Sequence, residues 1–492
     1  MSNQIAKLGV GLLACFLLLF VQLNRVTVFG AQELKDNPGN TRSVLRDFDA
    51  PRGTIVTADE VVVARSDATP EGARFDFART YPEGDLFAHT VGYFSLNLGS
   101  TGVEDTYNAQ LAGRTLDLSF RDFDDLFVDR DRVGDVRLSL RADAQRVAKD
   151  LLGDRQGSVV AIDPRSGELL AMWSWPSFDP NALATQDFGA ANDAFALFQA
   201  DERDPLLAKT YRERFFPGST FKVVTAAAGL SSGAVTAEQP VYPTTREYTP
   251  PQTTRPLRNF GGSTCGGNLF DILRVSCNTA FAQMAVDLGA ETMVDQAQSF
   301  GFNEAPPIDL PSPARSVFPT DFDQNLPALA QAGIGQNDVS ATPLQMALVA
   351  AAVANEGRVM TPRVVADIRD DDNSVVEDPE PSQWRRAVST EHAEILRRAM
   401  IEVAERGTAR NLRIPGMEVG GKTGTAQLGT DPPRSHAWII GFAGPPGQPA
   451  SVAVAVLVEG QPGASEQTGG QVAAPIARAV METVLAAQGG GA

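Results

Sequence analysis

The chain has 492 residues, which is enough for two or three domains. Hydrophobic residues make up 43% of it and charged residues 21%, as in an ordinary globular protein. The formal net charge is −18, so little positive charge is left to neutralise phosphates, which argues against nucleic acid as a partner.

The chain begins with an apolar segment. Leu8–Leu23 contain no charge, and Val26–Phe29 extend the run toward the roughly 20 residues that a membrane-spanning helix needs. A cleaved signal peptide is the alternative, with Val28 and Gly30 at positions −3 and −1. The run is longer than a usual signal core, so we predict an uncleaved anchor over residues 1–31, with the bulk of the chain exported.

The next segment, residues 32–134, is predicted to form a small mixed domain. Arg52–Ile55 and Val61–Arg65 indicate two strands joined by a turn. Aspartates cluster between residues 122 and 131, but their spacing matches no calcium loop, so we predict a solvated loop and no metal.

Residues 135–488 are predicted to form the main domain. Asp135–Leu140 alternates like an edge strand, and a helix follows over 142–152. Short apolar runs predict further strands at 159–162, 169–174, 438–443 and 452–458. Helices are predicted over 287–300, 342–354, 393–404 and 472–487. The stretch 240–254 is rich in Pro and Thr and is predicted to be an exposed loop.

Ser219 follows the turn signal Pro217-Gly218 and opens an alanine-rich helical run. Lys222 lies three residues later, so both side chains are expected on one helix face. Such a pair offers a hydroxyl nucleophile beside an amine that could take its proton. An N-cap serine near a solvated lysine is the alternative for so short a pattern.

The lysines add weight to the catalytic interpretation. Six lysines stand among 42 basic residues, and two of them are Lys222 and Lys422. A desolvated lysine can give up its proton near neutral pH, whereas arginine cannot.

Cysteines are few. Cys15 lies in the apolar segment, which leaves Cys265 and Cys277 in the exported part as a candidate disulfide. Because Cys277 lies between Ser276 and Asn278, such a bond would restrain both neighbours. Two buried free thiols are the alternative.

Three motifs occur in a fixed order: S-x-x-K at Ser219, S-x-N at Ser276 and K-T-G at Lys422. This ordered set of motifs is typical of class A β-lactamases and penicillin-binding proteins. The chain resembles the penicillin-binding protein transpeptidases over roughly residues 135–488, where Gly333–Gln336 and Ala341–Gln345 also match. Asn259–Gly262, Cys265 and Ser435–Trp438 look most like an actinobacterial branch of that family.

The resemblance implies an α+β fold, in which a five-stranded antiparallel sheet is flanked by helices. An N-terminal membrane anchor and a small mixed pedestal domain would precede it. A pedestal of about a hundred residues leaves no length for a glycosyltransferase domain, so the resemblance is to class B, transpeptidase-only members.

The resemblance also implies the chemistry. Ser219 would attack the penultimate D-alanine of a stem peptide, with Lys222 as base. Ser276 would relay a proton to the leaving amine and Asn278 would bind the substrate amide. The substrate carboxylate would be held by the K-T-G strand, namely Lys422, Thr423, Gly424 and Thr425. The oxyanion would lie between the backbone N–H groups of Ser219 and Thr425.

The expected partners are stem peptides ending in D-Ala-D-Ala, β-lactam antibiotics, the membrane, and proteins of cell division or elongation. No cofactor is expected. The expected location is the plasma membrane, spanned once, with the catalytic domain on the extracytoplasmic side. A D,D-carboxypeptidase side activity stays open, because water could replace the acceptor amine.

Other functions fit less well. A Ser-His-Asp hydrolase would need a G-x-S-x-G motif, which the sequence lacks, and His436 precedes a core strand, where we interpret it as structural. A class A β-lactamase would need a deacylating glutamate after S-x-N, and no convincing E-x-x-L-N follows that motif. A β-lactam sensor would need several membrane segments, whereas the sequence indicates one. An inactive scaffold would tolerate loss of the nucleophile, whereas all three motifs are intact here.

Overall fold

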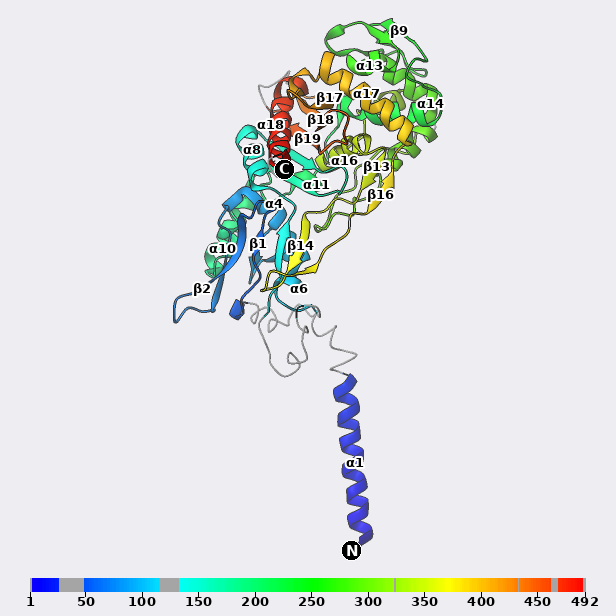
Figure 1. Cartoon of the computed structure of the whole chain (residues 1–492). Helices are drawn as coiled ribbons and strands as arrows, with labels where there is room; N and C mark the ends of the chain where they lie inside the picture. The colour runs from blue at the N-terminus through cyan, green and yellow to red at the C-terminus, as the bar shows by residue number, and fades with distance from the viewer. Residues whose placement is uncertain are drawn as a thin grey trace. The chain divides into compact units, whose positions relative to one another are not determined.

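The computed structural model describes residues 2–25, 48–115, 118, 132–322, 324–431, 433–461 and 468–489 (Figure 1). The predicted aspartate loop at 122–131 lies outside them. Two compact units are present: one contains Met1–Pro51 and Asp67–Ala78, the other Arg52–Ser66 and Arg79–Ala492. Within the first unit, α1 (Ser2–Asn24) is long and apolar enough to cross a membrane, by length and composition.

The centre of the second unit is an antiparallel sheet with the strand order β17-β18-β19-β7-β8. Its strands are β17 (Glu418–Gln427), β18 (Ser435–Gly444), β19 (Val452–Val458), β7 (Gly157–Ile162) and β8 (Leu169–Trp175). Every residue of β18 and β19 is buried, so both faces of the sheet are covered. This confirms the predicted five-stranded sheet flanked by helices.

Four helices pack on this sheet: α8 (Ala142–Leu152), α16 (Pro343–Ala354), α17 (Thr390–Arg406) and α18 (Gly469–Gly489). The α16 helix is buried along its whole length, and its start is set by its sequence. The Thr342 side chain caps it by accepting a hydrogen bond from the Gln345 N–H, and Pro343 occupies the first turn.

A helical region lies beside the sheet. It contains α12 (Lys222–Ser231), α13 (Leu269–Arg274), α14 (Asn278–Ser299) and α15 (Leu326–Ala332). The α14 helix begins at Asn278, ahead of the predicted start at Asp287. Gly289, with a φ of 81°, interrupts its helical backbone, so the predicted helix at 287–300 spans this break.

A second sheet has the strand order β15-β14-β6-β1-β2-β3. Its strands are β1 (Ile55–Val56), β2 (Val62–Ala68), β3 (Phe77–Thr80), β6 (Asp135–Leu138), β14 (Val365–Arg369) and β15 (Val375–Glu377). The prediction of an edge strand at Asp135–Leu140 is wrong, because β6 pairs with β1 on one side and with β14 on the other. Its alternation reflects a sheet with one buried face.

Candidate active site

A cleft of about 1220 Å³ opens between the five-stranded sheet and the helical region. Of the eight residues predicted for catalysis or substrate binding, five line the cleft: Ser219, Ser276, Asn278, Thr423 and Thr425. The others lie behind its wall, because Lys222 and Lys422 are fully buried and Gly424 is buried within β17.

Ser219 lies in a short 3₁₀ turn, η4 (Gly218–Phe221), which leads into α12. The α-helix therefore starts at Lys222, later than predicted. The turn is held by Gly335, whose carbonyl accepts a hydrogen bond from the Gly218 N–H at 2.9 Å. A Cβ atom on Gly335 would lie 2.1 Å from the Gly218 carbonyl oxygen, so only glycine allows this approach.

The K-T-G motif lies on β17, which is an edge strand of the five-stranded sheet. An edge strand leaves alternate backbone N–H groups without a sheet partner. The sequence predicted that Gly424 lets a ligand approach the backbone, but here the protein itself makes the approach. A Cβ atom at 424 would lie 2.9 Å from Thr220 Cγ2 and 3.0 Å from the Pro217 carbonyl oxygen, so this glycine lets η4 lie on β17.

The S-x-N motif forms the turn between α13 and α14. Ser276 has a φ of 58°, a left-handed conformation that non-glycine residues seldom adopt. Cys277 is the N-cap of α14 and Asn278 is its first residue. The tight turn thereby points Ser276 and Asn278 into the cleft wall next to the two buried lysines.

Ser276 joins these lysines. The Lys422 Nζ donates to Ser276 Oγ at 2.8 Å and to the Thr423 carbonyl at 2.8 Å. The Lys222 Nζ contacts Ser276 Oγ at 3.2 Å, the Ser276 carbonyl at 2.7 Å and Asn278 Oδ1 at 2.6 Å. One hydroxyl therefore connects the S-x-x-K and K-T-G motifs.

Burial lowers the pKa of both lysine amines. Desolvation and then the charge of Lys422 hold the pKa of the Lys222 amine well below its usual range. Desolvation also lowers the pKa of Lys422, to about 7. The positive charge of Lys422 thus favours the neutral form of Lys222, and a neutral Lys222 can accept a hydrogen bond from the Ser276 hydroxyl.

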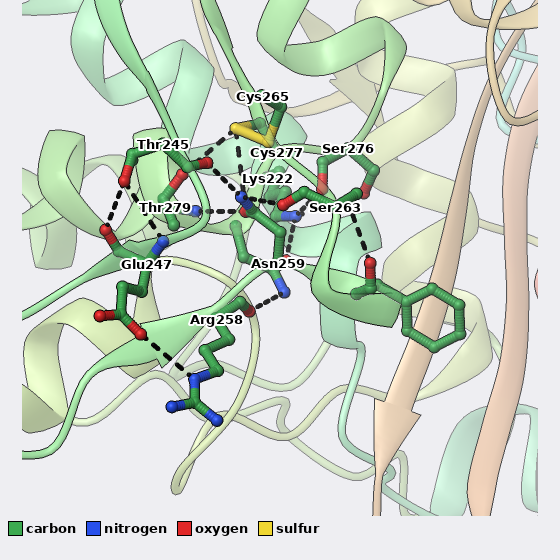
Figure 2. The surroundings of a disulfide bond; sticks show 12 residues. Lys222, Thr245, Glu247, Arg258, Asn259, Ser263, Cys265, Ser276, Cys277 and Thr279 are labelled. Atoms are coloured by element: carbon green, nitrogen blue, oxygen red, sulfur yellow. Dashed lines mark hydrogen bonds and ion pairs between the residues drawn. A yellow bond between two sulfur atoms is a disulfide. The ribbon is translucent and has the colours of Figure 1, made fainter.

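Cys265 and Cys277 form a disulfide with an S–S distance of 2.13 Å (Figure 2). Cys265 belongs to a segment with four short strands, β9 (Tyr242–Thr245), β10 (Glu247–Tyr248), β11 (Leu257–Arg258) and β12 (Cys265–Gly267), which we call the arm. The predicted loop at 240–254 thus contains β9 and β10.

The arm is attached to the S-x-N turn by more than the disulfide. Asn278 Nδ2 donates to the Arg258 carbonyl at 3.0 Å, and the Thr279 N–H donates to Asn259 Oδ1 at 3.0 Å. Figure 2 shows Arg258, Asn259 and Thr279 in the surroundings of the disulfide. The arm therefore fixes the position of Asn278, whose other side-chain atom contacts Lys222.

The cleft has further lining residues that the sequence analysis missed. Thr408 approaches the K-T-G strand, since its Oγ1 lies 2.6 Å from Thr423 Oγ1. Others are Thr253, Arg255, Arg258, Gln331, Gln336, Arg410, Asn411, Thr468 and Gln471. Gln336 belongs to the Gly333–Gln336 stretch that resembles the family, and the others lie in no recognisable motif. They come together only because the arm, α15, the α17 exit and the α18 entry converge in space.

His436 lies outside the cleft lining. Its Nδ1 accepts a hydrogen bond from the Gly460 N–H at 3.1 Å, and its ring meets Phe215 edge-on at 5.4 Å. Burial, and to a lesser extent the charge of Lys209, lowers the pKa of His436 to about 4. A neutral, packed imidazole here fits the predicted structural role.

A serine at a cleft, two buried lysines that share a second serine, and an edge strand define a serine acyltransferase site of the penicillin-binding class. The family model for the penicillin-binding protein transpeptidase domain matches residues 157–482. The chain therefore belongs to the penicillin-binding protein transpeptidase family. Residues 52–136 match the model of the penicillin-binding protein A dimerisation domain.

Two relatives and one solved structure show which members of the family this chain is similar to. The peptidoglycan D,D-transpeptidase PbpA of Mycolicibacterium smegmatis is 39% identical over 99% of both chains, and PbpA of Mycobacterium tuberculosis is 36% identical over the same shares. A ceftriaxone acyl-enzyme structure of M. tuberculosis penicillin-binding protein A matches with a TM-score of 0.82 and 36% identity. It covers 90% of this chain and 100% of its own.

Proposed function

We propose that Ser219 is the nucleophile through which this peptidoglycan D,D-transpeptidase cross-links stem peptides. The observation that carries the proposal is the Ser276 hydroxyl, which joins both buried lysines at the wall of the cleft that Ser219 lines. Only an unprotonated amine can act as base, and burial beside Lys422 favours that state for Lys222.

In the first half-reaction, Ser219 Oγ attacks the carbonyl carbon of the penultimate D-alanine, and Lys222 takes the hydroxyl proton. The oxyanion accepts hydrogen bonds from the backbone N–H groups of Ser219 and Thr425. The carbon–nitrogen bond then breaks, and the proton passes from Lys222 through Ser276 to the leaving amine of the terminal D-alanine. Asn278 holds the donor amide meanwhile.

The terminal carboxylate of the donor is bound by Lys422 and by the hydroxyls of Thr423 and Thr425. In the second half-reaction an acceptor amine attacks the acyl-enzyme from the side that D-alanine left, and the same groups move the proton in reverse. β-Lactams, whose carboxylate and strained amide imitate this terminus, acylate the same serine.

The predicted organisation belongs to the same proposal. Residues 1–31 anchor the chain by a single span, 32–134 form the pedestal and 135–488 carry the chemistry on the extracytoplasmic side of the plasma membrane. The apolar α1 helix supports the anchor. Division or elongation proteins are the expected partners of the anchored enzyme.

The test uses the full-length protein in detergent, labelled with a fluorescent penicillin and mapped by mass spectrometry. We expect label on Ser219, its loss in Ser219→Ala, and full labelling of the control Ser232→Ala, which changes an exposed serine just past the α12 helix. Incubation with a stem pentapeptide and an amine-bearing stem peptide should then give a cross-linked dimer. Release of D-alanine without any dimer would favour a D,D-carboxypeptidase, and a folded protein without label would favour the scaffold.

A further inference from the structure

The charged residues that line the cleft are all arginines. Among the described residues they are Arg255, Arg258 and Arg410, with no Asp or Glu beside them. This is unexpected in a chain with a net charge of −18. Arg258 pairs with Glu247 at 3.3 Å, whereas neither Arg255 nor Arg410 forms an ion pair with a described carboxylate. The cleft therefore offers uncompensated positive charge to an anionic ligand.

Arg410 also lines a second cavity, of about 680 Å³, that adjoins the first. The two cavities share Arg410 and Asn411, so the cleft continues past Thr408. The second cavity adds Arg413, which likewise has no described carboxylate partner, and Arg478, which pairs with Glu482 at 2.9 Å. Glu482 also lines the extension, so three arginines face one carboxylate there and positive charge remains in excess.

The segment that carries these arginines is held in place from two directions. The Thr408 N–H donates to the Arg274 carbonyl at 3.3 Å, and Asn411 Nδ2 donates to the Gly470 carbonyl at 2.8 Å. A Cβ atom on Gly470 would lie 2.5 Å from the Thr408 carbonyl oxygen, so the start of α18 packs directly on this segment. A fixed backbone lowers the entropy cost of binding a ligand there.

The direction of the extension identifies its ligand. Thr408 contacts Thr423, which under the proposed function holds the carboxylate of the departing D-alanine. Because the acceptor amine enters where that D-alanine left, the rest of the acceptor strand must extend beyond Thr423, toward Arg410. The donor strand would then bind at the opposite end of the cleft, beside the arm.

We propose that the extension lined by Arg410 and Arg413 is the acyl-acceptor subsite, and that it selects acceptor stem peptides carrying a free carboxylate. The inference rests on the proposed function. A guanidinium can hold a carboxylate with two parallel hydrogen bonds, which also orients the acceptor amine toward the acyl-enzyme. Arg410, which lies in both cavities, makes the first contact, and Arg413 supports it.

The experiment compares two amine-bearing acceptor peptides, one with free carboxylates and one with carboxamides in their place. Full-length wild type, Arg410→Gln and Arg413→Gln are assayed for cross-linked product with one donor pentapeptide. We expect Arg410→Gln to raise the KM for the carboxylate acceptor about tenfold, the value of one charge-assisted hydrogen bond, with a smaller rise for Arg413→Gln. Penicillin acylation should change less than the KM for the carboxylate acceptor, because the β-lactam carboxylate is held at Lys422, Thr423 and Thr425 under the proposed function.

The matched control is Arg406→Gln. Arg406 is an exposed arginine at the end of α17, pairs with Glu402 and lines neither cavity. This variant should leave both acceptors unaffected. Equal use of the two acceptors by wild type, or an equal loss for both in Arg410→Gln, overturns the acceptor subsite but leaves the transpeptidase intact. If wild type makes no dimer with either acceptor although penicillin labels Ser219, the proposed function and the subsite fail together.

Discussion

Lys222 and Lys422 are the same residue type and both are fully buried, yet the proposed mechanism needs them in different protonation states. Lys222 must be neutral to accept the serine proton, and Lys422 must be charged to hold a carboxylate. The structure separates them because the Lys422 charge adds to desolvation at Lys222. Ser276 Oγ lies within hydrogen-bond distance of both amines.

This arrangement predicts how acylation depends on pH. The pKa of Lys422 is about 7, so the cation that we propose binds the β-lactam carboxylate is present below pH 7 and is lost as the pH rises through it. The second-order rate constant for acylation of the free enzyme should therefore fall above about pH 7. At saturating β-lactam the fall should move to higher pH, because the bound carboxylate keeps Lys422 protonated. Stopped-flow acylation across pH measures both curves.

The comparison variant is Lys422→Arg. Arginine keeps its charge throughout this range, so the descending limb should disappear even if the absolute rate drops. A descending limb at the same pH in this variant would assign it to another group and contradict the interpretation of Lys422.

At the scale of elements, the disulfide connects the arm to the S-x-N turn. It closes a loop with a sequence separation of 12 residues, and the chain-entropy argument gives such a loop about 2–4 kcal/mol of stabilisation. Because Cys277 lies between Ser276 and Asn278, its loss should also loosen catalytic groups. We expect Cys265→Ser to lower the free energy of unfolding by about that amount and to slow penicillin acylation severalfold.

Reduction of the wild type provides the matched measurement. A mild reductant should reproduce the effect of Cys265→Ser in the wild type and add nothing to the variant. Unchanged acylation after complete reduction, checked by thiol counting, would mean that Asn259 and Arg258 alone hold the turn in place.

The elements also show what a sequence can and cannot predict. The sequence predicts Ser219, Ser276 and Lys422 as site residues because each belongs to a short local motif. It does not predict Thr408 and Arg410, since they reach the cleft only through the packing of the α17 exit on α18, which has no local signature. The position of β6 was misjudged for the same reason: its partner β14 lies far along the chain.

At the scale of the whole molecule, the strands of the two sheets alternate along the chain. The β14 and β15 strands come from within the predicted transpeptidase region but pair in the sheet that holds β1 and β2. Asp309 accepts hydrogen bonds from the Val364 and Val365 N–H groups at the start of β14, and from the Tyr107 hydroxyl. The sheet that holds β1 and β2 is therefore built partly from strands of the predicted transpeptidase region.

In the segment predicted to form the pedestal, Glu104 is fully buried between two arginines. Arg52 Nε lies 2.7 Å from one carboxylate oxygen and Arg79 Nε lies 2.6 Å from the other. Burial opposes ionisation of this carboxyl, yet the two guanidiniums lower its pKa. Removing either partner of such a group is strongly destabilising, because it leaves a buried charge uncompensated.

These contacts predict that residues 135–488 do not form a stable domain alone. Without residues 52–134, β6 loses its partner β1, Asp309 loses Tyr107, and a sheet edge is exposed to aggregation. We expect this fragment to be insoluble or to melt without cooperativity. A longer fragment, 52–489, should melt cooperatively and take up fluorescent penicillin on Ser219 at the rate of the full chain, since it keeps both sheets. Cooperative melting of 135–488, with full penicillin uptake, would show that the catalytic region is independent of the pedestal.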